Sequence, residues 1–159
     1  MTFGCFCGKI KGDVGHILRY LALAGAGLVL AACGPGAEPR PDLYIADVWA
    51  RPAPEGGNGV AYLTIENKGG QADRLLSLRT EVARRVDLHE SRTENGVVRM
   101  RPVHEVEIPG RGRVEFKPGG LHVMLIGLSR ALQPDDTFPL WLKFGRSGER
   151  QVQVRVAQP

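Results

Sequence analysis

The sequence predicts an all-β fold, an antiparallel sandwich or barrel, for the part of the chain that follows residue 42. Short segments in which apolar and polar residues alternate recur along this part, and glycine, proline or an Asn–Gly pair separates each from the next. No long stretch carries the period of an amphipathic helix. A chain of 159 residues without an internal repeat is expected to contain one such domain.

The first 33 residues are typical of a targeting segment. Basic residues, among them Lys9 and Lys11, precede an apolar run, residues 21–32, that is short for a transmembrane helix and rich in small residues. The run ends in Leu-Ala-Ala-Cys at Cys33, which resembles the lipobox of bacterial lipoproteins. This resemblance implies that residues 1–32 are a lipoprotein signal peptide and that Cys33 is lipidated. An ordinary signal peptide that happens to end at a cysteine is the alternative.

Residues 33–42 are expected to form a flexible or extended tether, because they are rich in proline and glycine. The folded domain is then expected to cover residues 43–159. The cysteines Cys5, Cys7 and Cys33 all lie at or before the expected anchor, so the domain has no disulfide. It must therefore be stabilised by a hydrophobic core, which a chain of this size can build.

The expected strands of the domain are short and closely spaced. Asn95 and Gly96 predict a tight hairpin turn between two of them. The alternation is clearest in residues 138–144, where every second residue is Phe or Leu. The ten expected strands cover residues 43–50, 60–67, 74–80, 83–89, 97–101, 105–108, 113–116, 121–126, 138–144 and 152–156.

The composition argues against two broad classes of function. Without the expected signal peptide, 18 of the 21 basic and 16 of the 17 acidic residues remain, since that peptide contains Lys9, Lys11, Arg19 and Asp13. The charges are interspersed and the basic residues do not alternate with aromatic ones, so nucleic acid is not an expected partner. No Ser-His-Asp arrangement and no pair of carboxylates stands out, so the protein is not expected to be an enzyme.

Histidine and methionine are scarce in the domain, and most of them fall in one stretch. His89 is followed after ten residues by Met100, and after twenty-one more by His122 and Met124, which are two residues apart. Strand alternation places His89 away from the core and puts His122 and Met124 on one strand face. Two imidazoles and two thioethers, without a carboxylate, suit Cu(I) better than zinc, calcium or magnesium.

Taken singly, each of these residues has an ordinary explanation. Met100 shares a strand face with Val98 and alone would be assigned to packing. The domain, however, contains only three histidines and two methionines, and both methionines belong to the pattern together with two of the histidines. The third histidine, His104, has no partner in the pattern and is expected at the surface. As histidine is a common metal ligand, substitution by His104 stays an alternative.

The spacing His-x10-Met-x21-His-x-Met matches the motif of the periplasmic copper chaperones of the PCu(A)C type. The surrounding blocks are similar to this family and follow one another in the same order: Ala-Tyr-Leu-Thr-Ile-Glu-Asn at 61–67, Val-Asp-Leu-His-Glu at 86–90 and Asp-Thr-Phe-Pro-Leu-Trp-Leu at 136–142. The resemblance covers about residues 43–156, which is essentially the whole domain. It implies a cupredoxin-like antiparallel β-sandwich of Greek-key topology.

The resemblance also implies a site and a function. His89, Met100, His122 and Met124 would bind one Cu(I) in a periplasmic protein held at the cell envelope membrane by its lipid anchor. Such a chaperone would deliver copper by ligand exchange during assembly of the CuA site of cytochrome c oxidase. The implied partners are subunit II of the oxidase or a Sco-type copper protein.

Other classes of function fit the sequence less well. A blue-copper electron carrier needs a cysteine thiolate at the metal, and the domain has none. A thiol-disulfide enzyme is disfavoured for the same reason. A metal-free envelope lipoprotein that acts as an interaction scaffold stays an alternative, against which only the His/Met set argues.

Overall fold

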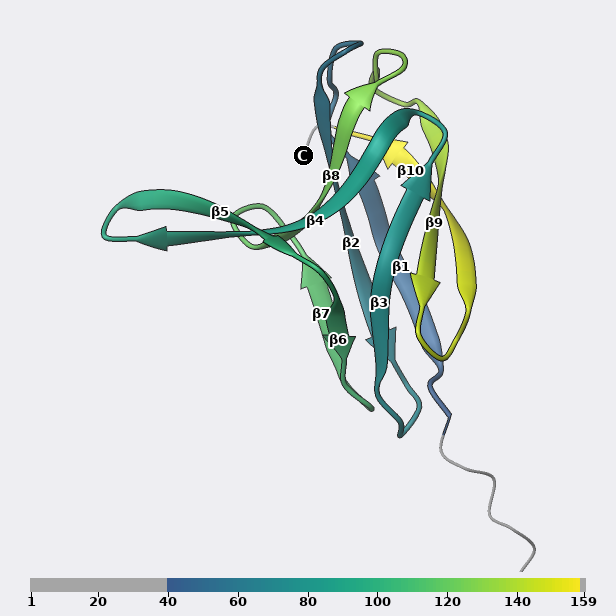
Figure 1. Cartoon of the computed structure of the whole chain (residues 1–159). Helices are drawn as coiled ribbons and strands as arrows, with labels where there is room; N and C mark the ends of the chain where they lie inside the picture. The colour runs from purple at the N-terminus through teal and green to yellow at the C-terminus, as the bar shows by residue number, and fades with distance from the viewer. Residues whose placement is uncertain (1–39, 158–159) are drawn as a thin grey trace, which may run out of the picture. The chain divides into compact units, whose positions relative to one another are not determined.

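The computed structural model describes residues 40–157 (Figure 1). The expected signal peptide, Cys33 and most of the expected tether lie outside the described residues. Pro35–Pro159 is a compact unit by itself. Among residues 40–157, no helix is long and apolar enough to cross a membrane.

All ten expected strands are present, most of them within two residues of the expected ends. They are β1 (Leu43–Ala50), β2 (Asn58–Asn67), β3 (Asp73–Thr80), β4 (Ala83–Glu94), β5 (Val97–Val103), β6 (Val106–Ile108), β7 (Arg113–Phe116), β8 (Leu121–Leu128), β9 (Thr137–Phe144) and β10 (Glu149–Val156).

The largest difference from expectation is the length of β4, which continues five residues beyond His89 to Glu94. Its outer half pairs with β5 all the way to the turn, so that the two strands project from the sandwich as a hairpin (Figure 1). Asn95 and Gly96 both have positive φ, 52° and 78°. This is the combination that a type I′ turn needs, and it confirms the turn that the Asn–Gly pair predicts.

The strands form one continuous ladder in the order β5-β4-β8-β2-β1-β10-β9-β3-β6, with β7 also paired to β2. Every pairing is antiparallel except that between β1 and β10, where Trp49 lies beside Arg155 and Ala50 beside Val156. The expected all-β sandwich is confirmed, but the sheet is mixed rather than wholly antiparallel. Alternation within a strand gives no information about the direction of its neighbour, so this parallel pair was not foreseeable.

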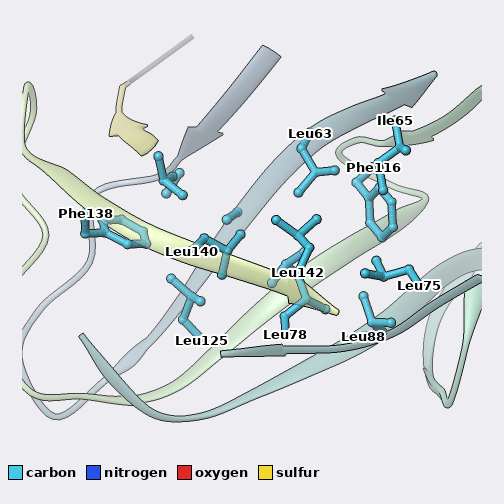
Figure 2. Packing of buried hydrophobic residues seen from close by; sticks show 14 of the residues in the cluster. Leu63, Ile65, Leu75, Leu78, Leu88, Phe116, Leu125, Phe138, Leu140 and Leu142 are labelled. Atoms are coloured by element: carbon cyan, nitrogen blue, oxygen red, sulfur yellow. The ribbon is translucent and has the colours of Figure 1, made fainter. Parts of the chain in front are cut away.

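The core consists of aliphatic and aromatic residues from nearly every strand. Figure 2 shows Leu140 and Leu142 of β9 packed among residues from β2, β3, β4 and β8. Both leucines are fully buried, as is Phe138 on the same strand. Burying one such side chain contributes about 1.5–3 kcal/mol. Because the cluster is apolar throughout, we expect the domain to fold without a metal.

Two buried polar residues fasten the end of the sandwich at which β1 begins. The side-chain oxygen of Asn67 accepts hydrogen bonds from the backbone N–H groups of Asp42 and Gly69. Asp73, only 2% exposed, accepts backbone hydrogen bonds from Arg74, Arg146 and Ser147. Burial acts to raise the pKa of Asp73, but these hydrogen bonds outweigh it and hold the pKa below its ordinary value.

Candidate metal centre

Three neighbouring strands carry the four candidate ligands. His89 lies on β4, His122 and Met124 lie on β8, and Met100 lies on β5. Because β4 is the central strand of the three, both of its neighbours contribute to the surface around His89.

The candidate ligands share one face of the sheet. Leu88, Val123 and Leu125, which alternate with them, are buried in the core. Successive side chains of a strand point to opposite sides, so His89, His122 and Met124 lie on the face turned away from the core. This confirms the strand alternation predicted from sequence.

The register brings the two histidines directly opposite each other. His89 pairs with His122 across β4 and β8, and their ring centroids are 5.9 Å apart with the rings edge to face. Met124 pairs with Asp87, which places it diagonally from His89. Met100 pairs with Ser91 and is therefore diagonal to His89 on the other side. Diagonal neighbours on a sheet face are about 7–8 Å apart, within reach of a long, flexible methionine side chain.

A backbone turn fixes the orientation of the His122 ring. Nδ1 of His122 lies 3.0 Å from the carbonyl oxygen of Gly120, and since a carbonyl can only accept, Nδ1 carries the proton. The turn itself is closed by a hydrogen bond from Gly120 N to Lys117 O, with Gly119 at φ 76°. Nε2 of His122 is left with its lone pair free, as metal-binding histidines require.

His89 differs from His122 because one of its ring nitrogens lacks a hydrogen bond. Its Nδ1 is buried and has no hydrogen-bond partner, and it is the only such side-chain nitrogen or oxygen within the described part of the chain. An unsatisfied buried polar atom costs about 1–3 kcal/mol. A metal ion bound to this nitrogen would satisfy it, so the ring fits a ligand role better than a packing role.

The four residues differ widely in exposure. His122 is 4% exposed and buried, Met124 and His89 are half-buried, and Met100 is 51% exposed. Strand alternation predicts that His122 and Met124 share one strand face, but it does not predict that the His122 ring on that face is buried. The turn before β8 folds its own backbone beside the ring, a contact that strand alternation does not reveal.

The described residues contain no group of three or more His, Cys, Asp or Glu side chains that could hold a metal ion. His104 is exposed between β5 and β6, consistent with the surface position expected for it. Asp87, on the ligand face opposite Met124, is engaged by Arg85 at 3.0 Å.

Sequence reasoning missed an aromatic border to this face. Trp49 and Tyr62 pair across β1 and β2 with ring centroids 4.6 Å apart. Val60 of β2 is the cross-strand partner of Met124, and Tyr62 lies two residues further along the same face. The only signal in the sequence is their alternation with core residues, which says nothing about which strands become neighbours.

Comparison with known proteins identifies the family of the domain. The family model of the putative LpqE-like lipoproteins matches residues 43–156. The chain belongs to this LpqE-like family.

Curated relatives of this LpqE-like protein carry little functional description. It is 27% identical over 120 residues to an uncharacterised protein of Rickettsia prowazekii, a match that covers 72% of this chain and 66% of the relative. It is 26% identical over 138 residues to a putative lipoprotein of Leifsonia xyli subsp. xyli, covering 86% and 82% of the two chains.

Solved structures are more informative. The copper-bound PCuAC domain of PmoF2 is 25% identical, with a TM-score of 0.61, and the match covers 74% of this chain and 93% of that domain. The Cu(I) form of a protein from Deinococcus radiodurans is 29% identical, with a TM-score of 0.57 and coverage of 80% and 85%. The resemblance to PCu(A)C-type domains seen in the sequence is thereby confirmed for this LpqE-like protein.

Proposed function

We propose that this protein is a Cu(I)-binding chaperone of the cell envelope, with His89, Met100, His122 and Met124 as the ligands of a single ion. The observation that carries the proposal is the pair of facing histidines. His122 donates its Nδ1–H to the Gly120 carbonyl, which leaves its Nε2 free to bind a metal, and His89 has a buried nitrogen without a partner. Two thioethers lie on the same face, and copper-bound relatives share the fold.

The ligand set selects the oxidation state. Thioethers are neutral and imidazoles bind in their neutral form, so the four ligands add no negative charge to the ion. Soft, neutral ligands favour Cu(I) over Cu(II) and over hard divalent ions. Copper here is cargo that the protein carries, and no bond of another substrate is made or broken.

The differences in exposure suggest how the ion is released. Met100, the most exposed ligand, lies on the projecting hairpin, whereas His122 is buried and oriented by backbone. A cysteine thiolate of a partner would bind copper as the Met100 sulfur leaves, and the remaining ligands would then be exchanged in turn. The ion thus passes to the partner without ever being free, and it moves toward the site of higher affinity.

The cellular setting is the second part of the proposal. Residues 1–32 serve as the signal peptide, Cys33 carries the lipid, residues 33–42 are the tether, and residues 43–159 bind copper in the periplasm. Family membership among putative lipoproteins supports the anchor. The recipient would be subunit II of cytochrome c oxidase, for its CuA site, or a Sco-type protein that acts before it.

Transfer can be tested directly. The Cu(I)-loaded domain is mixed with the apo-form of a soluble oxidase subunit II domain or of a Sco-type protein, the two are separated, and copper in each is counted. Copper should move to the acceptor, and faster from a Met100→Leu variant if Met100 is the first ligand released. Retention of copper by the wild type in the presence of both acceptors would reject the delivery role while leaving Cu(I) binding intact.

The alternative is a metal-free scaffold of the envelope. A domain that takes up no Cu(I) from a competing chelator would favour the scaffold. The partnerless nitrogen of His89 is the specific observation against it, because a scaffold gains nothing from an unsatisfied buried polar atom.

A further inference from the structure

Four chain segments meet at one end of the sandwich, the end at which β1 begins (Figure 1). They are the residues before β1 and the turns β2–β3, β6–β7 and β9–β10. Backbone hydrogen bonds tie them together: Lys68 N donates to Asp42 O, and Arg111 N donates to Gly69 O, each at 2.8 Å. The buried Asp73 holds the β9–β10 turn through Arg146 N at 2.8 Å. We call this the tether end.

Each of the four segments at the tether end presents an exposed basic residue. These are Arg40, Lys68, Arg111 and Arg146, and the exposed acid among the same segments is Asp42. None of the four basic residues takes part in an ion pair among residues 40–157. The connecting segments of the tether end therefore carry more exposed basic than acidic residues, and a further carboxylate, that of Glu107 on β6, lines a neighbouring pocket with Arg146.

The opposite end of the sandwich has a different charge balance. It is formed by the β1–β2, β3–β4 and β8–β9 connections, which hydrogen-bond to one another between Gly56 and Leu128 and between Ser129 and Val82. These connections contain two basic residues, Arg51 and Arg130. They contain four acidic residues, which are Glu55, Glu81, Asp135 and Asp136. Asp135 is paired with Arg155 at 2.6 Å and Asp136 with Arg130 at 2.7 Å, so two of these carboxylates are neutralised and the opposite end lacks the excess of unpaired basic groups found at the tether end.

A pocket of ≈ 390 Å³ lies at the tether end. Three arginines, Arg40, Arg146 and Arg150, line it together with Pro41, Gln71 and Ser147, and no carboxylate does. Arginine is well suited to phosphate, because its planar fork of N–H donors can bind two phosphate oxygens at once. Asp73 lies beneath Arg146, but its oxygens are occupied by backbone N–H groups and it is buried.

Chain length ties this pocket to a membrane. Cys33, the proposed lipidation site, precedes Arg40 by only seven residues, which can span at most about 25 Å even when fully extended. A lipid on Cys33 would therefore keep the three arginines close to the bilayer surface. A tether of this length allows the arginines to approach the bilayer to within the Debye length of about 8–10 Å, over which an anionic surface attracts basic groups.

We propose that the tether end binds the phosphate groups of anionic phospholipids and seats the domain on the membrane that holds its anchor. A headgroup phosphate binds in the pocket to Arg40, Arg146 and Arg150. The charges of Lys68 and Arg111 add longer-range electrostatic attraction to the bilayer. The opposite end of the sandwich then faces away from the bilayer, and the β4–β5 hairpin with Met100 stays clear of the bilayer. The position of the anchor rests on the proposed function, but the phosphate chemistry of the pocket does not.

The test uses the compact unit without its lipid, residues 35–159, so that only the protein surface can bind. It is sedimented with vesicles of phosphatidylcholine alone or with phosphatidylglycerol added, at low and at high salt. Binding should require the anionic lipid and should weaken as salt rises. Equal binding to both vesicles, or to neither at low salt, would overturn the proposal.

Matched variants locate the binding surface. Arg146→Gln with Arg150→Gln removes two charges from the pocket, and Arg51→Gln with Arg130→Gln removes two from the far end. At roughly fivefold for each charge near an anionic surface, the pocket variant should bind about twenty-five-fold more weakly, while the far-end variant should bind at least as well as wild type. Equal losses in both would mean that net charge alone matters and would refute a local site.

Two further measurements distinguish membrane binding from the binding of free phosphate and from the proposed chaperone role. Millimolar inorganic phosphate that raises the melting temperature, without any vesicle binding, would identify a free-anion site and overturn the membrane role. Cu(I) uptake is measured on the same variants and should be unchanged, because the pocket and the His/Met set lie on different strands. Failure of Cu(I) binding in wild type would sink the chaperone role while leaving the vesicle result to stand by itself.

Discussion

Replacement of His89 by leucine should make the apo-protein more stable while it abolishes the copper site. The buried Nδ1 of His89 has no partner, and leaving such an atom unsatisfied costs about 1–3 kcal/mol. Leucine has a comparable size and no polar atom, so His89→Leu removes this cost. We expect a gain of about 1–2 kcal/mol in the free energy of unfolding, and each kcal/mol should raise the melting temperature by about 3–5 °C in a domain of this size.

The assay is thermal unfolding with and without Cu(I). Free Cu(I) at about one hundred times the dissociation constant should stabilise the wild type by about 2.7 kcal/mol, because it binds only the folded state. The His89→Leu variant should melt higher than wild type without copper and should show little further shift with it. His104→Leu is the matched control, since His104 is exposed and outside the proposed set; its melting should respond to copper as wild type does.

Two results would refute this reasoning. If His89→Leu melts several degrees below wild type, the ring is a packing element and not a poised ligand. If the variant gains as much from Cu(I) as wild type, the ion is bound elsewhere.

Three other predictions concern the stability of the domain in acid, the uptake of Cu(I) in acid and the lipid anchor. Hydrogen bonds lower the pKa of Asp73, so its carboxylate adds stability above about pH 4, and this stability is lost as the pH falls through the pKa of the folded state. In urea titrations, Asp73→Asn should therefore be less stable than wild type at pH 7 and should lack this loss of stability in acid. Acidification should also weaken Cu(I) uptake, measured by chelator competition, since a protonated imidazole offers no lone pair. Cys33→Ser should release the protein from membranes or leave it unprocessed; unchanged mass and fractionation would reject lipidation.

Local pattern was enough to predict most of the fold. Alternation located all ten strands, and the Asn95–Gly96 pair located the tightest turn. The outer half of β4 was missed because residues 90–94 have no apolar alternation: they are stabilised by pairing with β5 and lie away from the core. The parallel pairing of β1 with β10 was missed because it joins residues from opposite ends of the domain.

For the candidate site, residue types and spacing could be recognised in the sequence, but geometry could not. A period of two placed His122 and Met124 on one face. That His89 faces His122 depends on the register between β4 and β8, which is set by the whole sheet. The proton on Nδ1 of His122 and the partnerless nitrogen of His89 depend on single atoms of the backbone and its packing, which no residue pattern encodes.

The central claim is that both histidines and both thioethers hold one Cu(I), and titration of the purified domain with Cu(I) under a competing chelator tests it most directly. Wild type should take up one equivalent, with sulfur and nitrogen scatterers in its X-ray absorption spectrum. Met124→Leu keeps the side-chain volume nearly constant and removes only the thioether, so it should bind more weakly while its apo-form melts like wild type. Equal Cu(I) affinity in wild type and Met124→Leu would contradict the account.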